Sequence, residues 1–291
     1  MDIDHLVRKA DYKINHWSQK LFYPRSDRYS EAVECYVKAG DIQYTHKNYS
    51  QAIVLFEKAI STMRDCSSTQ HDYYESSEIF GKILKGYKKL DNVEKQIETL
   101  LELIENCKSS GRFQHLAQLY VKVAELTAQV PERHELSINF YALAADAVDN
   151  ERTAILYLIS AAKLCVTNQK LADAIFHYKR IFSLMDKCTG SLLMVQQGQT
   201  FIEYLCCVLA LGDLVMANRL MVSDSWRLAS YDTTFAATLL QSMNNQNLDL
   251  FQETVCSFDE QKKLTPQLTA LLLACKKQLT PAAAAAENPL L

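Results

Sequence analysis

The feature that most constrains the fold is a repeated helical signature: a small residue, an aromatic four positions later, and a second small residue three positions after that. The signature appears as Ala32, Tyr36 and Ala39, and again as Ala52, Phe56 and Ala59. Positions i, i+4 and i+7 share one helix face, so the small residues let a neighbouring helix approach while the aromatic ring fills the gap. Residues 29–61 are therefore predicted to form a tetratricopeptide-type helical hairpin, with Gly40 to Asn48 supplying the helix end and the turn.

The signature returns at intervals close to the length of one helix and its turn. It recurs with Tyr120, Tyr141, Leu158 and Tyr178 in the place of the aromatic or large apolar residue. Two further helices are expected near residues 70–89 and 92–108. From Gly190 onward the signature fades, and apolar spacing alone indicates helices near residues 191–211, 213–228, 231–245, 248–257 and 265–279. Atypical terminal repeats of this kind commonly cap a solenoid.

The predicted fold is all-α: a tetratricopeptide-like, right-handed solenoid of helical hairpins, or twisted sheet of antiparallel helices, with a C-terminal helical bundle cap. The low content of helix breakers agrees, since the 291 residues include only 7 Gly and 5 Pro while 48% are apolar. The predicted division is an N-terminal helix and apolar membrane-contact loop (1–28), helical hairpins (29–189), a helical bundle (190–279) and a flexible tail ending in Leu-Leu (280–291).

Several classes of function find no support. A net charge of −3 argues against a nucleic-acid partner. Nucleotide, hydrolase and metalloprotease motifs are absent, and the histidines are dispersed, so we predict no enzyme, no cofactor and no metal site. The nine cysteines form no CxxC pair, and Cys206 and Cys207 point about 100° apart on a helix. Without a signal peptide or a long apolar run, the protein is expected to be soluble and cytoplasmic.

An apolar segment interrupts the N-terminal pattern. Residues 3–17 read as an amphipathic helix, but Trp17, Leu21, Phe22 and Tyr23 then lead directly to Pro24. Proline disfavours α geometry in the residue before it, which predicts a helix end or a loop here. One interpretation is that these side chains staple the first helix to the second. The other is a membrane-touching loop whose neighbours Lys20, Arg25 and Arg28 meet anionic headgroups.

Two other features also have two interpretations each. Lys82, Lys85, Lys88 and Lys89 recur at helical spacing, either as a solvated face or as a grip on an acidic rod. The pair Leu290-Leu291 is either a dispensable end or a short linear contact for a partner pocket.

Taken in this order, the features resemble the soluble N-ethylmaleimide-sensitive-factor attachment proteins, the SNAP adaptors of membrane fusion, over essentially the whole length. Residues 17–32 are similar to the family's apolar loop and first repeat helix. Tyr87–Asp91, Gly111–Phe113 and the stretch from Leu239 to Lys277 are similar to characteristic family segments. The leucine pair resembles the alpha-type branch.

The resemblance implies an adaptor that is monomeric alone and acts in several copies, peripheral on membranes. The copies would wrap the SNARE four-helix bundle, and their C-terminal ends would recruit and stimulate a hexameric AAA ATPase that disassembles the bundle. Carried over residue by residue, Lys88, Lys89 and Arg112 would contact SNARE helices. Trp17, Leu21, Phe22 and Tyr23 would make weak contact with lipid, and Leu290 and Leu291 would act on the ATPase.

The sequence departs from the family at two places. Gln118, Leu156 and Ser160 align near lysines of the family's concave face, and Lys122 or Arg180 are candidates to compensate. The family's acidic ATPase-facing cluster is replaced by the uncharged Gln241, Asn244 and Asn245. The alternative function is a generic tetratricopeptide-like scaffold for another peptide partner, which explains the hairpins equally well.

Overall fold

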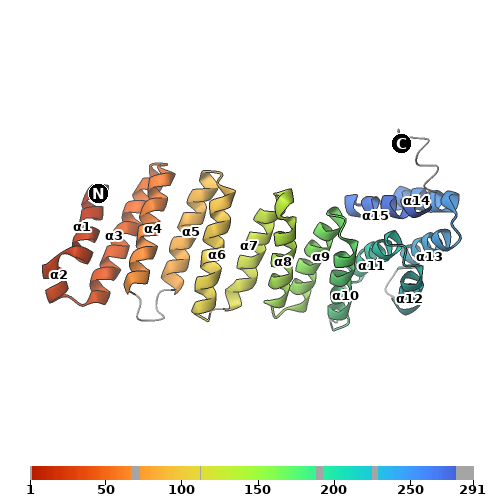
Figure 1. Cartoon of the computed structure of the whole chain (residues 1–291), viewed down its shortest axis with the longest axis horizontal. Coiled ribbons are helices and arrows are strands. Elements are labelled where there is room, and N and C mark those ends of the chain that lie inside the picture. The colour runs from red at the N-terminus through yellow and green to blue at the C-terminus, as the bar shows by residue number, and fades with distance from the viewer. Residues whose placement is uncertain (1, 67–72, 112, 188–192, 225–228, 280–291) are drawn as a thin grey trace. The chain divides into compact units, whose positions relative to one another are not determined.

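The computed structural model describes residues 2–66, 73–111, 113–187, 193–224 and 229–279. All regular elements in these ranges are helices (Figure 1). The all-α fold class of helical hairpins is therefore confirmed. The chain divides into two compact units, residues 1–127 and 128–291. The division into domains at residues 28, 189 and 279 stays a prediction.

The first unit is a row of antiparallel helices. Its elements are α1 (Ile3–Asn15), α2 (Trp17–Phe22), α3 (Arg25–Thr45), α4 (Tyr49–Cys66), α5 (Tyr73–Lys89), α6 (Val93–Ser109), the 3-10 helix η2 (Phe113–His115) and α7 (Leu116–Ala128), whose last residue falls in the second unit. α3 packs on α1, and α4, α5 and α6 each pack on the preceding helix. The signature residues Ala32, Tyr36, Ala52 and Phe56 are all buried between them.

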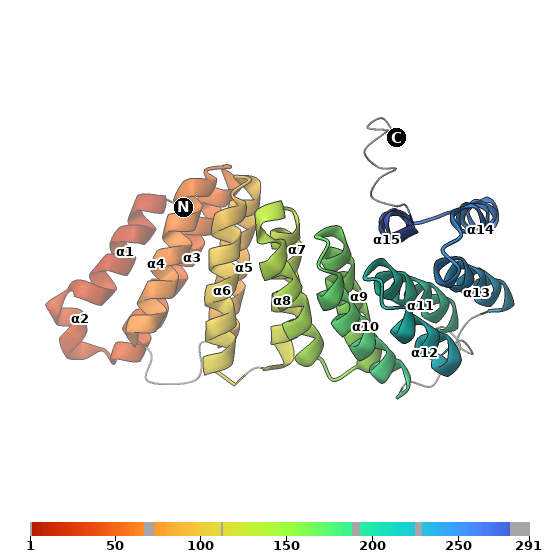
Figure 2. The same ribbon diagram turned by 45° about the vertical axis from the view of Figure 1, so that its right-hand side comes forward.

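The second unit has one continuous core that runs from Ile138 to Leu279. Its elements are η3 (Pro131–Arg133), α8 (His134–Asp146), α9 (Glu151–Thr167), α10 (Leu171–Met185), α11 (Leu193–Ala210), α12 (Leu214–Asp224), α13 (Ser230–Asn244), α14 (Leu248–Gln261) and α15 (Pro266–Leu279). α11 contacts α10, α12, α13 and α15, and α13 lies beside α14 (Figure 2). Every residue from Phe201 to Ala210 is buried, so α11 is the centre of this core.

The same turn joins successive helices at five places. In each, the second residue after the helix has a positive φ, between 51° and 78°. The N–H of the residue that follows it donates to the carbonyl of the residue five positions before that donor. The positive-φ residues are Lys47, Asp91, Gln169, Gly212 and Gln246. This is the Schellman arrangement, which satisfies carbonyls that the helix end leaves free. Asn92 and Asn247 directly follow two of these positive-φ residues, and each side-chain oxygen accepts a hydrogen bond from an N–H in the first turn of the next helix at 3.0 Å. At these two places the same short joint ends one helix and caps the next.

Two details differ from the sequence-based prediction. α3 does not end near Gly40 but continues to Thr45, and Gly40 faces Phe56 so closely that a Cβ there would lie 2.5 Å from the ring. The glycine thus serves helix contact, not a turn. The N-terminal helix ends at Asn15, and Trp17–Phe22 form a separate short helix in which His16 accepts the N–H of Ser18. In the described ranges, we find no helix with the length and apolarity needed to cross a bilayer.

Candidate functional site

The short helix α2 lies at one end of the first unit (Figure 1) and carries, with Tyr23 at its end, a group of exposed apolar side chains. Its members are Trp17, Leu21, Phe22 and Tyr23, with exposed fractions of 69%, 68%, 71% and 50%. α2 buries none of its residues in the core. We call these four residues the apical patch. Contiguous exposed apolar surface of this kind is typical of membrane or partner contact sites.

Contacts with α1 fix α2 without burying the patch. The ring of His16 stacks on Tyr12 at 4.4 Å and its Nδ1 lies 2.7 Å from Ser18 Oγ, while Lys13 Nζ lies 5.1 Å from the centre of the Tyr23 ring. α1 and α3 are joined by other groups: Tyr36 donates to Asp11 at 2.5 Å, and Lys13 pairs with Glu31 at 2.8 Å. Tyr23 of the patch thus contacts α1, and Trp17 stacks on His16 at 6.0 Å, while Leu21 and Phe22 are exposed, so the stapling and the membrane interpretations both stay predictions.

The three basic neighbours of the patch have different surroundings. Lys20 is exposed on α2. Arg25 is exposed as well, but its guanidinium donates to the carbonyl of Asp65 at 2.5 Å. Arg28 is buried and donates to the carbonyls of Lys13 and Ile14 at the end of α1. The expectation that Arg28 meets headgroups is therefore wrong, because the residue serves to cap a helix.

The lysines of α5 divide into one structural residue and three exposed ones. Lys82 pairs with Asp41 of α3 at 2.8 Å and lies 5.8 Å from the centre of the Phe56 ring. Lys85, Lys88 and Lys89 are exposed, and no ion pair to them is found within the described ranges. We call these three residues the basic end of α5. Positive charge in the last helical turn is favoured by the helix dipole.

The last turn of α5 is held against α4. Tyr87 donates to Glu57 at 2.8 Å, and burial, followed by this hydrogen bond, raises the pKa of Tyr87 to about 12. Lys88 and Lys89 therefore project from a fixed turn. Arg112, Leu290 and Leu291 lie outside the described residues, so their predicted contacts, like those of Lys88, Lys89 and the apical patch, stay predictions.

The structure describes the surroundings of the positions that align near the family's concave-face lysines and of the two basic residues suggested to compensate for them. Gln118 and Lys122 are both exposed on α7, and Leu156 on α9 is 51% exposed. Ser160 donates to the carbonyl of Leu156 at 3.2 Å. Arg180 is paired with Asp146, so it is already engaged within the second unit.

The end of α13 presents an uncharged surface. Gln241, Asn244 and Asn245 are exposed, and the side-chain amides of Asn244 and Asn218 are hydrogen-bonded at 3.4 Å. Beside it, α14 presents three exposed carboxylates, those of Asp249, Glu253 and Glu260, for which no ion pair is found in the described part of the chain. Negative charge is therefore present on the neighbouring helix.

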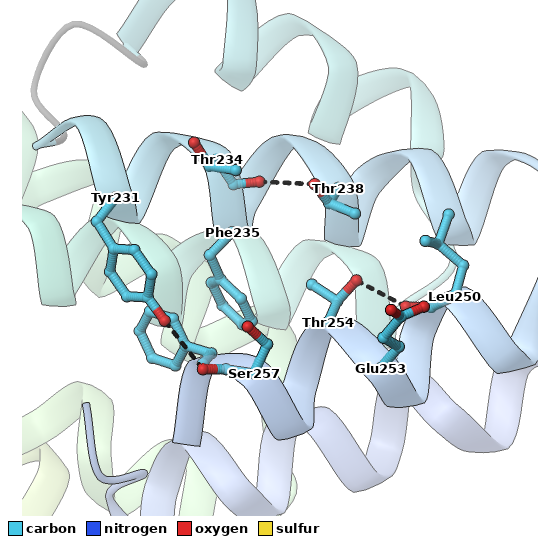
Figure 3. A pocket seen from close by; sticks show the side chains of 9 residues that line it. Tyr231, Thr234, Phe235, Thr238, Leu250, Glu253, Thr254 and Ser257 are labelled. Carbon is cyan, nitrogen blue, oxygen red and sulfur yellow. Dashed lines mark hydrogen bonds between the residues drawn. The ribbon is translucent and has the colours of Figure 1, made fainter. Parts of the chain in front are cut away.

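A groove of about 260 Å³ runs between α13 and α14 (Figure 3). Aromatic rings line one end, where Tyr231 donates to the carbonyl of Ser257 at 3.2 Å. Three threonines line the rest together with Leu250 and Glu253, and the hydroxyls of Thr238 and Thr254 donate to carbonyls of their own helices. Sequence reasoning missed this groove, although Tyr231, Thr234 and Thr238 recur at helical spacing.

Across the described ranges, no group of three His, Cys, Asp or Glu could hold a metal ion.

Comparison with known proteins identifies the family. The family model described as "Soluble NSF attachment protein, SNAP" matches residues 1–280; proteins of this family are adaptors, not enzymes. The chain is 25% identical to mouse (Mus musculus) alpha-soluble NSF attachment protein, covering 94% of this chain and 93% of the relative. It is 22% identical to a probable vesicular-fusion protein sec17 homolog of Neurospora crassa, covering 88% of each. Among solved structures, BtubC from P. vanneervenii has 15% identity and a TM-score of 0.41, with 84% of this chain and 93% of BtubC covered. From the match over residues 1–280, the chain belongs to the soluble NSF attachment protein family.

Proposed function

We propose that this protein is a SNAP-type adaptor that binds the SNARE four-helix bundle and recruits and stimulates the hexameric AAA ATPase named N-ethylmaleimide-sensitive factor. An adaptor role in vesicular fusion follows from the family. The observation that carries the finer proposal is that one unit presents both an exposed apolar patch and exposed lysines that no described residue neutralises.

The apical patch would provide the membrane contact of a peripheral, cytoplasmic protein. Full burial of a large apolar side chain is worth about 1.5–3 kcal/mol, and a basic residue such as Lys20 adds about 1 kcal/mol near an anionic surface. Partial insertion of α2 therefore gives a weak and reversible anchor. Several copies on one SNARE bundle would strengthen it through avidity.

Lys88 and Lys89, with Arg112, would provide the SNARE contact. An exposed ion pair contributes roughly 0.2–1 kcal/mol, so each copy binds weakly and the sum over copies determines affinity. Leu290 and Leu291 would act on the ATPase. Because the end of α13 is neutral, the carboxylates of Asp249, Glu253 and Glu260 on α14 are the groups best suited to meet a basic partner surface.

The test is disassembly of a preformed SNARE complex by the ATPase and ATP, with and without this protein. We expect disassembly that depends on the adaptor, and loss of that activity with retained SNARE binding when Leu290 and Leu291 are deleted. SNARE binding without any disassembly would indicate an inhibitory member. No binding would leave the generic scaffold as the better description.

A further inference from the structure

A second groove, of about 340 Å³, lies between α14 and α15. Its apolar lining consists of Phe251, Val255, Leu264, Leu272 and Leu273; Phe251 and Leu272 are buried, and Val255 and Leu264 are half-buried. The side chain of Leu273 is 57% exposed. Gln252, Cys256, Thr269 and Lys276 complete the lining, and Cys256 is exposed. Covering open apolar surface of this kind with another apolar group lowers the free energy of the protein in water.

The chain itself supplies a segment of matching chemistry directly beside the groove. α15 ends at Leu279, one helical turn beyond Lys276. Residues 280–291 then read Thr-Pro, five alanines, Glu-Asn-Pro and Leu290-Leu291. Within this segment the large apolar side chains are the two leucines, and the ionisable side chain is that of Glu287.

We propose that residues 280–291 fold back and dock in the groove between α14 and α15, with Leu290 and Leu291 against Val255 and Leu273. The carboxylate of Glu287 has the charge that complements Lys276 of the lining. Two apolar side chains and one carboxylate thus meet the open apolar surface of Val255, Leu264 and Leu273 and one ammonium group.

The length of the segment permits this return. Thr269, the lining residue of α15 most distant from Leu279, lies about 15 Å away along the helix at 1.5 Å per residue. The twelve residues after Leu279 span about 40 Å when extended. Because the segment is tethered, its effective concentration at the groove is of millimolar order. An intrinsic dissociation constant of about 0.1 mM would then keep it docked for about nine-tenths of the time.

Docking would also regulate the proposed ATPase contact, a consequence that rests on the proposed function. The leucine pair cannot lie in the groove and act on a partner at once. Release from the groove would therefore accompany engagement of the ATPase. The docking itself involves neither SNARE proteins nor ATPase, so it can be tested separately.

The test is the rate at which Cys256 reacts with a maleimide in the full chain, with Cys256 identified by peptide mass spectrometry. We expect Leu290→Ser with Leu291→Ser to accelerate alkylation about tenfold, because the docked segment covers the thiol nine-tenths of the time. The matched control is Ala283→Ser with Ala284→Ser, which keeps the leucines and should leave the rate unchanged.

A substitution in the groove itself completes a double-mutant cycle. Leu273→Asn should accelerate alkylation in the otherwise unaltered chain but add little to Leu290→Ser with Leu291→Ser, because both changes remove the same contact. Equal rates for the unaltered chain and the leucine variant would overturn the proposal. Protection that rises with protein concentration would also overturn it, in favour of a second copy as the occupant.

Discussion

At the residue scale, Gly40 and Gly81, two of the glycines inside helices of the first unit, have opposite surroundings. A Cβ at Gly40 would meet the ring of Phe56 at 2.5 Å, whereas a Cβ at Gly81 would find no atom within 4 Å. Both residues lie inside helices. The first glycine is required by packing between α3 and α4, and the second only lowers the helix propensity of α5.

We therefore predict that Gly40→Ala and Gly81→Ala change stability in opposite directions. Overpacking costs about 1–3 kcal/mol, more than the roughly 1 kcal/mol that alanine gains in a helix, so Gly40→Ala should destabilise the protein. Gly81→Ala should stabilise it by about 0.5–1 kcal/mol. Urea unfolding of both variants measures the two effects. Stabilisation by Gly40→Ala would show that α3 and α4 can move apart at no cost.

His177 gives a pH dependence with a definite sign. Burial, followed by the nearby Arg180, lowers the pKa of His177 below its ordinary value near 6.5, and its buried Nδ1 has no hydrogen-bond partner among the residues that the structure describes. Since the unfolded state binds the proton more readily, this residue's contribution is complete above pH 6.5 and is lost as pH falls toward the folded pKa. The loss of stability between pH 7.5 and 5.5 should be smaller in His177→Leu than in the unaltered chain. Equal losses in denaturant titrations would contradict this.

At the element scale, α2 is a short helix whose exposed side chains are apolar apart from Lys20. Its position depends on contacts with Tyr12, His16 and Lys13 of the preceding segment, and two patch members take part: the Tyr23 ring lies 5.1 Å from Lys13 Nζ and the Trp17 ring 6.0 Å from that of His16. Changes at Leu21 and Phe22, which take part in none of these contacts, should therefore alter surface chemistry and leave the packing of α1 and α3 intact.

The double variant Leu21→Ser with Phe22→Ser should abolish most binding to anionic liposomes. The thermal unfolding midpoint should stay within about 2 °C of that of the unaltered chain, because substitutions of exposed residues usually change stability by less than about 0.5 kcal/mol. Vesicle flotation measures the binding. The matched control is Val54→Ser with Leu101→Ser, which removes two exposed apolar side chains elsewhere in the same unit. Binding that is unchanged in the patch variant, or equally reduced in the control, would argue against lipid contact through α2.

The elements that sequence could predict are those fixed by local spacing. Ala32, Tyr36 and Ala39 define a buried face by periodicity alone, and apolar spacing predicts the helices after residue 190. The role of Gly40 depends on Phe56 of another helix, and the burial of Arg28 depends on carbonyls at the end of α1. That Lys82 is ion-paired while Lys88 is exposed likewise depends on Asp41 of α3. Such contacts between helices are absent from a local pattern.

At the scale of the whole molecule, a net charge of −3 coexists with a local excess of positive charge at the basic end of α5. Attraction to an acidic coiled coil would therefore come from a small surface and not from the protein's overall field. Screening should reduce such attraction strongly, since the Debye length falls from about 10 Å at 0.1 M salt to about 3 Å at 1 M.

Lys88→Glu with Lys89→Glu should reduce retention on immobilised SNARE complex at least tenfold, and the remaining binding should depend less on salt. Lys9→Glu with Lys58→Glu is the matched control, because it makes the same change in net charge on exposed helices of the same unit. A salt-insensitive pull-down, or equal losses in both variants, would sink the proposed SNARE contact.

The repeated joint between helices has a consequence for engineering. Four of its five positive-φ residues are not glycine, and each carries a conformational cost of about 1–2 kcal/mol that glycine would relieve in part. Backbone hydrogen bonds close the turn, and at two of the joints Asn92 and Asn247 cap the next helix, so each hairpin brings its own connector. Hairpins could therefore be duplicated or exchanged at these positions as modules, with glycine introduced wherever a graft needs extra thermodynamic margin.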